Sequence, residues 1–206
     1  MRAASLIVHI ILAAGAGTRV GQPKGLLSLG GVPLVARLVH ESIAAGTQAI
    51  IVVTGAQSHA VAGCLQSVGS DFVRIIENKA WELGQTSSIR TGLVQLPTNA
   101  TAFMIHPVDH ALVRSHHLRS LFNAWETQES PRAILRPQFG ANFGHPVLFA
   151  SGYAPEFLAL ADHEPGHTVY RRHLREVVGV PMPDDGCNFD LDTPADLAEA
   201  TRRVCS

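Results

Sequence analysis

The chain of 206 residues carries a formal net charge of −1, and 46% of its residues are hydrophobic whereas only 6% are aromatic. This composition predicts an aliphatic core large enough for one α/β domain. It excludes the basic surface of a typical nucleic-acid-binding protein and the polybasic surface that binds anionic membranes. Any anionic ligand must therefore be held locally, by a few well-placed groups.

The cysteines favour a reducing compartment, so we expect a cytoplasmic protein. The three cysteines are Cys64, Cys187 and Cys205. Their odd number and the absence of CxxC spacing argue against a disulfide framework and a zinc knuckle. Arg2 and the apolar run behind it resemble a signal peptide, but one arginine makes a thin charged region and His9 interrupts the run. No other apolar run approaches the length of a membrane span.

The first half of the chain alternates between apolar runs and helical patterns. Short β-branched runs predict buried strands at 6–11, 49–53, 72–76 and 101–105. Apolar residues at helical spacing predict helices at 33–44, 58–66 and 89–93. Pro33 is expected to open the first of these helices and Gly46 to follow it as a C-cap. This alternation predicts a mostly parallel sheet that is covered by helices on both faces.

The second half continues with shorter elements. A helix is predicted around 118–125, and strands are predicted at 133–135 and 146–149, separated by a glycine-containing turn. Helices are expected at 153–160 and 167–174, with an extended segment at 177–180. The end, 189–197, predicts a strand, a loop and a final helix, with Thr193 as the N-cap and Pro194 as the first helical residue. No repeat or linker divides the chain, so we expect a single domain.

A glycine-rich loop behind the first strand carries the best phosphate-binding chemistry of the chain. Residues 12–24 read LAAGAGTRVGQPK. Gly15 and Gly17 let backbone N–H groups approach an anion closely, while Arg19 and Lys24 add a planar guanidinium and a point charge. The sequence is not a Walker A motif, and Gly21 comes one position late for the dinucleotide fingerprint GxGxxG. A purely structural turn is the alternative.

Carboxylates follow two later segments. Asp109 comes directly after the fourth predicted strand, and ligands of open α/β sheets bind beyond the carboxyl ends of strands. Asp190 and Asp192 are two residues apart and would share one side of the predicted extended segment. Ordinary roles remain open for each of them, as a solvated turn carboxylate for Asp109 and as a cap or turn residue for Asp192.

Five segments occur in the order LAAGxGxRxGxxK at 12–24, NxxWxxGxxxS at 78–88, PVD at 107–109, GHPVLF at 144–149 and DLDTPADL at 190–197. Together they resemble the motifs of the MobA-like NTP transferase family, and the LAAG form is most similar to its molybdenum cofactor cytidylyltransferase branch. The resemblance implies a single-domain, three-layer α/β/α Rossmann-like nucleotidyltransferase fold. It also implies a nucleotide-binding half at 1–110 and an acceptor-binding half at 111–206.

The resemblance implies a nucleotidyltransferase that needs Mg²⁺. It would join the nucleoside monophosphate of an NTP, with CTP favoured, to a phosphorylated small-molecule acceptor, with molybdopterin favoured, and release pyrophosphate. Arg19 and Lys24 would hold the triphosphate and act in catalysis, and Asp109 would bind Mg²⁺ with Asp192 or Asp190 as a second ligand. Electrostatic stabilisation supplies most of the catalysis in such a transfer, and an anionic phosphate acceptor needs no general base.

The predicted binding residues come from several loops. Those for the nucleotide are Leu12, Ala13, Ala14, Gly15, Gly17, Arg19, Lys24, Asn78, Gly84, Ser87 and Ser88. Helix capping is an equal alternative for the two serines, and Trp81 is expected to pack. Candidate acceptor residues are His110, His145, Asp190 and Arg171. The histidines form no HExxH motif or His/Cys cluster at ligand spacing, and the adjacent His116 and His117 are expected at the surface.

The resemblance is incomplete where an acceptor would bind. The family usually continues PxD with a polar residue and proline, whereas His110 and Ala111 follow Asp109, and EPGHTVYR at 164–171 stands where the branch often carries GDxGxR. A guanylyl- or other nucleotidyltransferase for a different phosphorylated metabolite, a non-catalytic nucleotide or cofactor-binding module and a dinucleotide binder are therefore alternatives. We expect small-molecule partners and no binding to nucleic acid or membranes. We also expect transient contact with a molybdoenzyme or cofactor-insertion protein.

Overall fold

Strands from nearly the whole length of the chain join one sheet. The structure, a computed structural model, describes residues 5–68 and 71–205, without the side chains of Ser67 and Cys205. The segment around Arg2 that resembles a leader lies outside the described residues. The strands of the main sheet are β1 (Ile7–Ala13), β4 (Ala49–Thr54), β5 (Val73–Glu77), β6 (Ala102–Pro107), β7 (Ile134–Phe139), β8 (Asn142–Phe143), β9 (Val147–Ala150) and β10 (Val177–Pro181).

These strands follow the order β10-β7-β9-β6-β1-β4-β5, with β8 paired to β7. Strand β9 runs antiparallel to both of its neighbours, and β8 is antiparallel to β7, whereas the other pairs are parallel. A separate hairpin consists of β2 (Ser28–Leu29) and β3 (Val32–Pro33). The mostly parallel sheet confirms the fold class that the sequence predicts.

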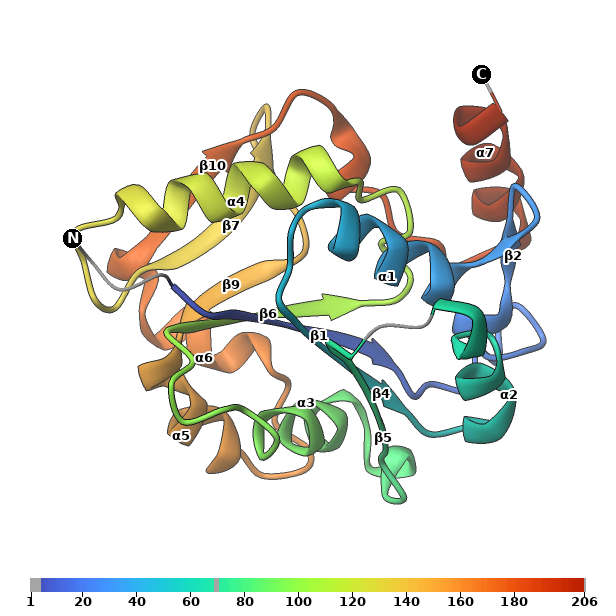
Figure 1. The fold of residues 1–206 in the computed structure, drawn as a ribbon, viewed down its shortest axis with the longest axis horizontal. Helices are drawn as coiled ribbons and strands as arrows, with labels where there is room; N and C mark the ends of the chain where they lie inside the picture. The colour runs from blue at the N-terminus through green and yellow to red at the C-terminus, as the bar shows by residue number, and fades with distance from the viewer. Residues whose placement is uncertain (1–4, 69–70, 206) are drawn as a thin grey trace.

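Helices cover the sheet in two layers (Figure 1). On one face lie α1 (Leu34–Ala44), α2 (Ser58–Gly63), α4 (Ser115–Thr127) and α7 (Pro194–Cys205), and on the other lie α3 (Gln85–Leu93), α5 (Ala154–Leu158) and α6 (His167–Arg172). Short 3-10 helices are η1 (Lys24–Leu26), η2 (Gln66–Val68), η3 (Trp81–Leu83), η4 (Ser151–Tyr153), η5 (Leu174–Glu176) and η6 (Asp185–Cys187). No helix in the described ranges is long and apolar enough to cross a bilayer.

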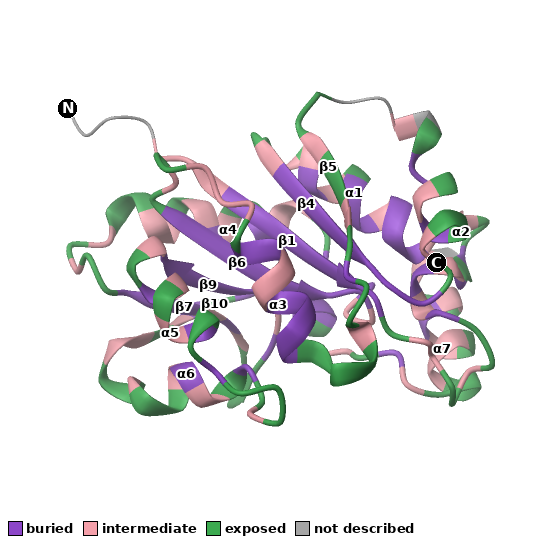
Figure 2. Ribbon diagram, turned by 90° about the horizontal axis from the view of Figure 1, so that it is seen from below, coloured by how far each residue is buried: buried purple, intermediate pink, exposed green. Residues whose placement is uncertain are grey.

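Two hydrophobic clusters fill the space between the sheet and these layers. Successive residues of β1 contribute alternately to the two clusters, because neighbouring side chains of a strand point to opposite faces of the sheet. Ile11 packs with α1 and α4, whereas Ile10 and Leu12 pack with α3 and α5. Figure 2 shows the central strands β1, β4 and β6 buried along almost their whole length. This two-sided burial explains why the strands are continuous apolar runs.

Three local predictions are wrong. Pro33 ends β3 with ψ 140°, so α1 begins one residue later, at Leu34. Helix α2 ends at Gly63, earlier than its apolar pattern predicts. Residues 189–192 form no strand, because they lie beyond β10 at the end of the sheet rather than along a neighbour. The final helix does begin at Pro194, with Thr193 Oγ1 accepting a hydrogen bond from Asp196 N.

A buried histidine pair links the sheet to helix α1. His9 Nε2 lies 2.9 Å from His106 Nδ1, and His9 Nδ1 lies 2.8 Å from the hydroxyl of Ser42. His106 Nε2 in turn lies 3.2 Å from the carbonyl oxygen of His110. Both rings are fully buried. Burial lowers the pKa of His9 to about 3 and holds the pKa of His106 well below its usual value. Both rings are therefore neutral at physiological pH.

We expect this pair to make the protein sensitive to mild acid. An unfolded histidine titrates near pH 6.5, whereas the folded pKa values of His9 and His106 are lower. The unfolded state then binds more protons, so stability is complete above about pH 6.5 and is lost as the pH falls towards the folded pKa. Each histidine contributes a slope of up to about 1.4 kcal/mol per pH unit.

Urea unfolding at pH 7.5 and pH 5.5 measures this loss. His9→Asn removes one of the two titrating rings and should flatten the pH dependence, whereas the matched control His59→Asn changes an exposed histidine and should keep it. Equal free energies of unfolding at the two pH values in the wild-type protein would contradict the assignment.

Candidate functional site

Loops that are far apart in the sequence meet at one edge of the sheet. Parallel strands place their carboxyl ends at the same edge, so the segments after β1, β5, β6 and β10 gather there. Strand β9 runs the other way, so His145 at its beginning reaches the same edge. The backbone N–H of Leu191 donates to the carbonyl oxygen of Asp109 at 3.1 Å, which holds the segment after β10 against the end of β6.

Four charged side chains form the centre of this edge, and the sequence predicts all four. Lys24 Nζ donates to Asp109 Oδ2 at 2.8 Å and to Asp192 Oδ1 at 2.5 Å. Arg19 Nη1 donates to Asp192 Oδ2 at 2.8 Å. We call these residues the charge cluster. Two carboxylates therefore converge on a single cationic atom beside the glycine-rich loop.

Asp192 is fixed by the start of helix α7. The carboxylate of Asp196 accepts hydrogen bonds from the backbone N–H groups of Asp192 (3.0 Å) and Thr193 (2.7 Å). Such a cap satisfies the free donors of a helix N-terminus and orients the chain that enters the helix. Asp190 is exposed. Residues 189–192 are not a strand, but buried Leu191 lies between the more exposed Asp190 and Asp192, and a shared side for the two carboxylates stays a prediction.

The charges of the cluster stabilise one another. Burial lowers the pKa of Lys24, but hydrogen bonds and charge from Asp109 and Asp192 outweigh it, and the pKa is raised overall. Hydrogen bonding to Lys24, followed by its charge and that of Arg19, lowers the pKa of Asp192. Lys24 is therefore cationic and Asp192 anionic at neutral pH, as binding of a phosphate chain and of a divalent cation requires.

The carboxylates fit a divalent metal ion. Oδ1 of Asp109 is buried and has no hydrogen-bond partner among the described residues. A buried carboxylate oxygen without a partner is energetically costly unless a ligand or an ion binds to it. Asp109 and Asp192 already meet within hydrogen-bond distance of one atom, Lys24 Nζ. Mg²⁺ prefers hard oxygen ligands and is often held by one or two carboxylates plus phosphates. The donor set thus suits Mg²⁺ bound together with a phosphate ligand.

The glycines of the loop have different tasks. Gly17 has φ +61°, and a Cβ there would collide with the carbonyl oxygen of Gln22, so the turn needs glycine. A Cβ at Gly15 would meet nothing within 4 Å, because this residue borders the open cleft. Gly15 therefore leaves space for a ligand, whereas Gly17 shapes the loop.

This difference predicts opposite outcomes for two substitutions. Gly15→Val should leave the melting temperature nearly unchanged and weaken NTP binding at least tenfold, because the side chain fills the cleft. Gly17→Ala should lower the stability by about 1 kcal/mol or more, because alanine is strained at positive φ. Thermal melts and NTP titrations of both variants check this. Normal NTP binding by Gly15→Val would contradict the placement of the ligand.

The loop from Asn78 to Ser88 is held by its own polar groups. The amide nitrogen of Asn78 donates to the hydroxyls of Ser87 (2.8 Å) and Ser88 (3.0 Å), and its oxygen accepts from Ala80 N at 3.0 Å. The side chains of Asn78, Ser87 and Ser88 are buried. Gly84 has φ +102°. Asn78 therefore positions the loop, while Gly84 and Ser88 border the cleft. Their contact with a nucleotide stays a prediction.

Two adjoining hollows lie at this edge. The first, which we name the nucleotide cleft after its predicted ligand, has a volume of about 320 Å³ and is bordered by Leu12, Ala14, Gly15, Lys24, Trp81 and Asp109. Ala13 is buried beneath it at the end of β1. Trp81 also packs against Gly55, because a Cβ added at Gly55 would lie 2.6 Å from the Cβ of Trp81. The second hollow, the aromatic cavity, has a volume of about 200 Å³ and shares Gln85 and Pro107 with the cleft.

The predicted acceptor residues are placed unequally. His110 and His145 lie with ring centroids 4.6 Å apart, and each has a buried Nδ1 without a partner among the described residues. Burial lowers the pKa of both, to about 3 for His145, so both are neutral. Arg171 is exposed on α6 and does not border the aromatic cavity. Asp190 is also exposed.

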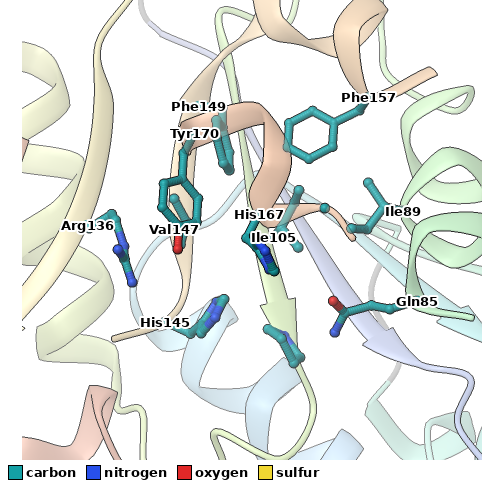
Figure 3. A pocket seen from close by; sticks show the side chains of 12 residues that line it. Gln85, Ile89, Ile105, Arg136, His145, Val147, Phe149, Phe157, His167 and Tyr170 are labelled. Carbon is teal, nitrogen blue, oxygen red and sulfur yellow. The ribbon is translucent and has the colours of Figure 1, made fainter. Parts of the chain in front are cut away.

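Sequence reasoning misses Arg136 on β7 and Tyr170 on α6, which line the aromatic cavity (Figure 3). The only signal in the sequence is one arginine directly after the apolar residues of a predicted strand. A charged side chain at that position is unusual in a parallel sheet that is covered on both faces.

The predicted surface position is wrong for His117 but not for His116, whose side chain is 41% exposed. His117 is fully buried, and its Nε2 lies 2.8 Å from Asp184 Oδ1 and 3.0 Å from His116 Nε2. These three residues could geometrically hold a metal ion. However, His117 Nδ1 accepts a hydrogen bond from the backbone N–H of Arg114, so Nε2 carries the proton and is not a free ligand. The cluster instead joins the start of α4 to the loop after β10.

Several known proteins are similar to this chain. Bifunctional protein GlmU of Nostoc sp. is 30% identical over 149 residues, 71% of this chain but 32% of that protein. A 2-C-methyl-D-erythritol 4-phosphate cytidylyltransferase of Nocardia farcinica is 32% identical over 108 residues, 52% of this chain and 45% of that protein. The chain thus matches less than half the length of either relative.

Solved structures of low sequence identity share the fold. A nucleotidyl transferase from Methanothermobacter, Mth528, has a TM-score of 0.79 at 19% identity and 97% and 98% coverage of the two chains. Rv0371c of Mycobacterium tuberculosis, in complex with manganese, has a TM-score of 0.72 at 22% identity, with 96% and 99% coverage. Molybdopterin-guanine dinucleotide biosynthesis protein A from Archaeoglobus fulgidus has a TM-score of 0.66 at 18% identity, with 96% and 98% coverage.

A family model described as the MobA-like NTP transferase domain matches residues 9–177. This span runs from the first strand, through the glycine-rich loop and Asp109, to the beginning of β10. It covers far more than half of the chain, and the protein therefore belongs to the MobA-like NTP transferase domain family.

Proposed function

We propose that this nucleotidyltransferase joins CMP from CTP to a phosphorylated small molecule, with a molybdopterin cofactor as the favoured acceptor, and releases pyrophosphate. The observation that carries the proposal is the charge cluster, in which Lys24 and Arg19 meet Asp109 and Asp192 beside an open glycine-rich loop. The cytidylyltransferase of Nocardia farcinica and the molybdopterin-guanine protein of Archaeoglobus fulgidus support the reaction type and the acceptor class.

The side chains suggest how the transfer is promoted. Lys24 and Arg19 would exchange their carboxylate partners for oxygens of the triphosphate and stabilise the charge that develops on the leaving pyrophosphate. Gly15 would let the backbone approach the same phosphates. Asp109 and Asp192 would hold Mg²⁺, which when bound supplies Lewis-acid polarisation of the phosphoryl oxygens. The acceptor phosphate is anionic at neutral pH, so no side chain has to remove a proton from it.

The other parts of the proposal follow from the same assignment. Residues 1–110 would bind the nucleotide and residues 111–206 the acceptor, with His110 and His145 at the boundary between them. A cytoplasmic location and transient contact with a molybdoenzyme or cofactor-insertion protein are consistent with a product that must be handed on.

Thermal melts with CTP, GTP, UTP and ATP, each with Mg²⁺, test which nucleotide the protein prefers. We expect CTP to raise the melting temperature most, because a ligand that binds the native state stabilises it more as its affinity rises. A larger shift with GTP would replace the cytidylyl proposal by guanylyl transfer. Pyrophosphate release is then measured with the preferred NTP and phosphorylated acceptors that include molybdopterin. Tight NTP binding without any release of pyrophosphate would favour a binding module instead of an enzyme.

A further inference from the structure

The aromatic cavity contains an unusual cation. Among the described residues, Arg136 is the partly buried arginine that has no carboxylate within ion-pair distance. Its Nε is buried and makes no hydrogen bond. The guanidinium is partly removed from water, and this burial lowers the pKa of Arg136. Arg136 has a side-chain hydrogen bond with Tyr170, but no carboxylate balances its charge. A partly buried charge without a counter-ion is costly, so this site is suited to an anionic or strongly accepting group that arrives with a ligand.

Two rings restrict how Arg136 can bind such a group. Its guanidinium carbon lies 4.9 Å from the ring centroid of Phe143 and 4.7 Å from that of Tyr170. The two ring contacts restrain the guanidinium, and its N–H groups that are not bonded to Tyr170 remain available as donors in one plane. Donors that lie in one plane match a flat acceptor edge such as a carboxylate or a ring amide.

One part of the cavity wall is apolar, while Gln85, His145 and His167 are polar lining residues. Ile89, Phe149 and Phe157 are almost completely buried and contribute to its wall. Figure 3 shows Arg136 beside Tyr170 on one side and Gln85 with Ile89 on the opposite side. A polyol would leave hydroxyl groups facing this wall without partners, which is unfavourable. A flat unsaturated ring can pack its faces on the aromatic side chains and turn its polar edge to Arg136.

The cavity also lies in the right place for an acceptor. It shares Gln85 and Pro107 with the nucleotide cleft, and Asp109 follows two residues after Pro107. His145 borders the cavity, and its buried Nδ1 has no partner in the described part of the chain. A neutral imidazole with a free nitrogen can accept or donate one hydrogen bond to a bound ring.

We propose that the aromatic cavity holds the non-reacting end of the acceptor, that this end is a flat unsaturated ring with a carboxylate or carbonyl edge, and that Arg136 anchors the edge. The inference rests on the proposed function, because it takes the shared border at Gln85 and Pro107 as the place where acceptor and nucleotide meet. Arg136 would then select flat acceptors over sugar and polyol phosphates.

The test uses the fluorescent probe pterin-6-carboxylate, with ribose 5-phosphate as a sugar phosphate of the disfavoured class. Fluorescence titration of the full chain should show saturable binding of pterin-6-carboxylate, and ribose 5-phosphate should not displace it. Arg136→Gln should weaken the binding roughly tenfold to a hundredfold, because hydrogen bonds to a charged group are lost. Arg136→Lys should also weaken it, because lysine keeps the charge but not the planar pair of donors.

Arg175→Gln is the matched control, since Arg175 is an exposed arginine on η5, and it should bind the probe like the wild type. Arg136→Lys keeps the test valid if Arg136→Gln does not fold. NTP binding with Mg²⁺ is measured in parallel: it should be unchanged in both Arg136 variants, and its absence in the wild type would count against the proposed function alone. No saturable probe binding, equal binding by the Arg136 variants, or preference for ribose 5-phosphate would overturn the inference.

Discussion

Asp109→Asn is expected to reduce pyrophosphate release by roughly a hundredfold to a thousandfold, the usual effect of removing one electrostatic group from a transfer site. Asparagine keeps the shape and an oxygen that can accept from Lys24 Nζ, so the fold should survive. The variant loses the negative charge whose second oxygen is buried without a partner among the described residues. NTP binding without Mg²⁺ should not weaken, because a negative charge beside the triphosphate is removed.

Initial rates of pyrophosphate release and NTP titrations in EDTA separate these two effects. Asp71→Asn is the matched control, because Asp71 is an exposed carboxylate just before β5 and outside the nucleotide cleft. It should keep the wild-type rate. If Asp109→Asn kept at least half of that rate, Asp109 would have to be removed from the site.

Lys24→Met is expected to change two properties in opposite directions. Turnover should fall roughly a hundredfold to a thousandfold, because a cation that stabilises the developing phosphate charge is lost. Binding of Mn²⁺ without nucleotide should become at least tenfold tighter. Lys24 Nζ lies 2.8 Å from Asp109 Oδ2, where a cation repels a metal ion that seeks the same carboxylate. Unit charges 4 Å apart interact by about 4 kcal/mol at an effective dielectric constant of 20, and partial exposure reduces this figure.

Calorimetric titration with Mn²⁺ measures the second property. Lys24→Arg retains the positive charge, so its Mn²⁺ affinity should stay near that of the wild type. Tighter Mn²⁺ binding together with lower turnover is not expected from simple loss of structure. Unchanged or weaker Mn²⁺ binding by Lys24→Met would show that Asp109 and Asp192 do not form a metal site.

The sequence predicts the strands of this protein well because their burial is two-sided. Continuous apolar runs such as those of β1 and β4 are typical of strands covered on both faces, and the parallel arrangement places Asp109 at the ligand-binding edge. The rule that parallel strands end at the same edge of a sheet is enough to predict that Lys24 and Asp109 lie close together. Asp192 could be assigned only through the family resemblance, because residues 189–192 lie outside the sheet and are fixed by the contact between Leu191 N and Asp109 O.

Other side chains depend on contacts that spacing does not encode. His117 is buried and lies within hydrogen-bond distance of Asp184, a loop residue 67 positions away in the sequence. The sequence predicts that Asn78 faces the nucleotide, yet its amide is occupied by Ser87, Ser88 and Ala80. A short-range pattern identifies such polar residues but cannot distinguish a ligand contact from an internal hydrogen bond.

Equilibrium titration of CTP with and without Mg²⁺ tests the role of the charge cluster most directly. In the absence of a metal ion, Asp109 and Asp192 repel the triphosphate and compete with it for Lys24 and Arg19. A divalent ion between the carboxylates and the phosphates removes the repulsion and releases both cations. We predict that Mg²⁺ tightens CTP binding at least tenfold. Equal or weaker binding in Mg²⁺ than in EDTA would contradict the account.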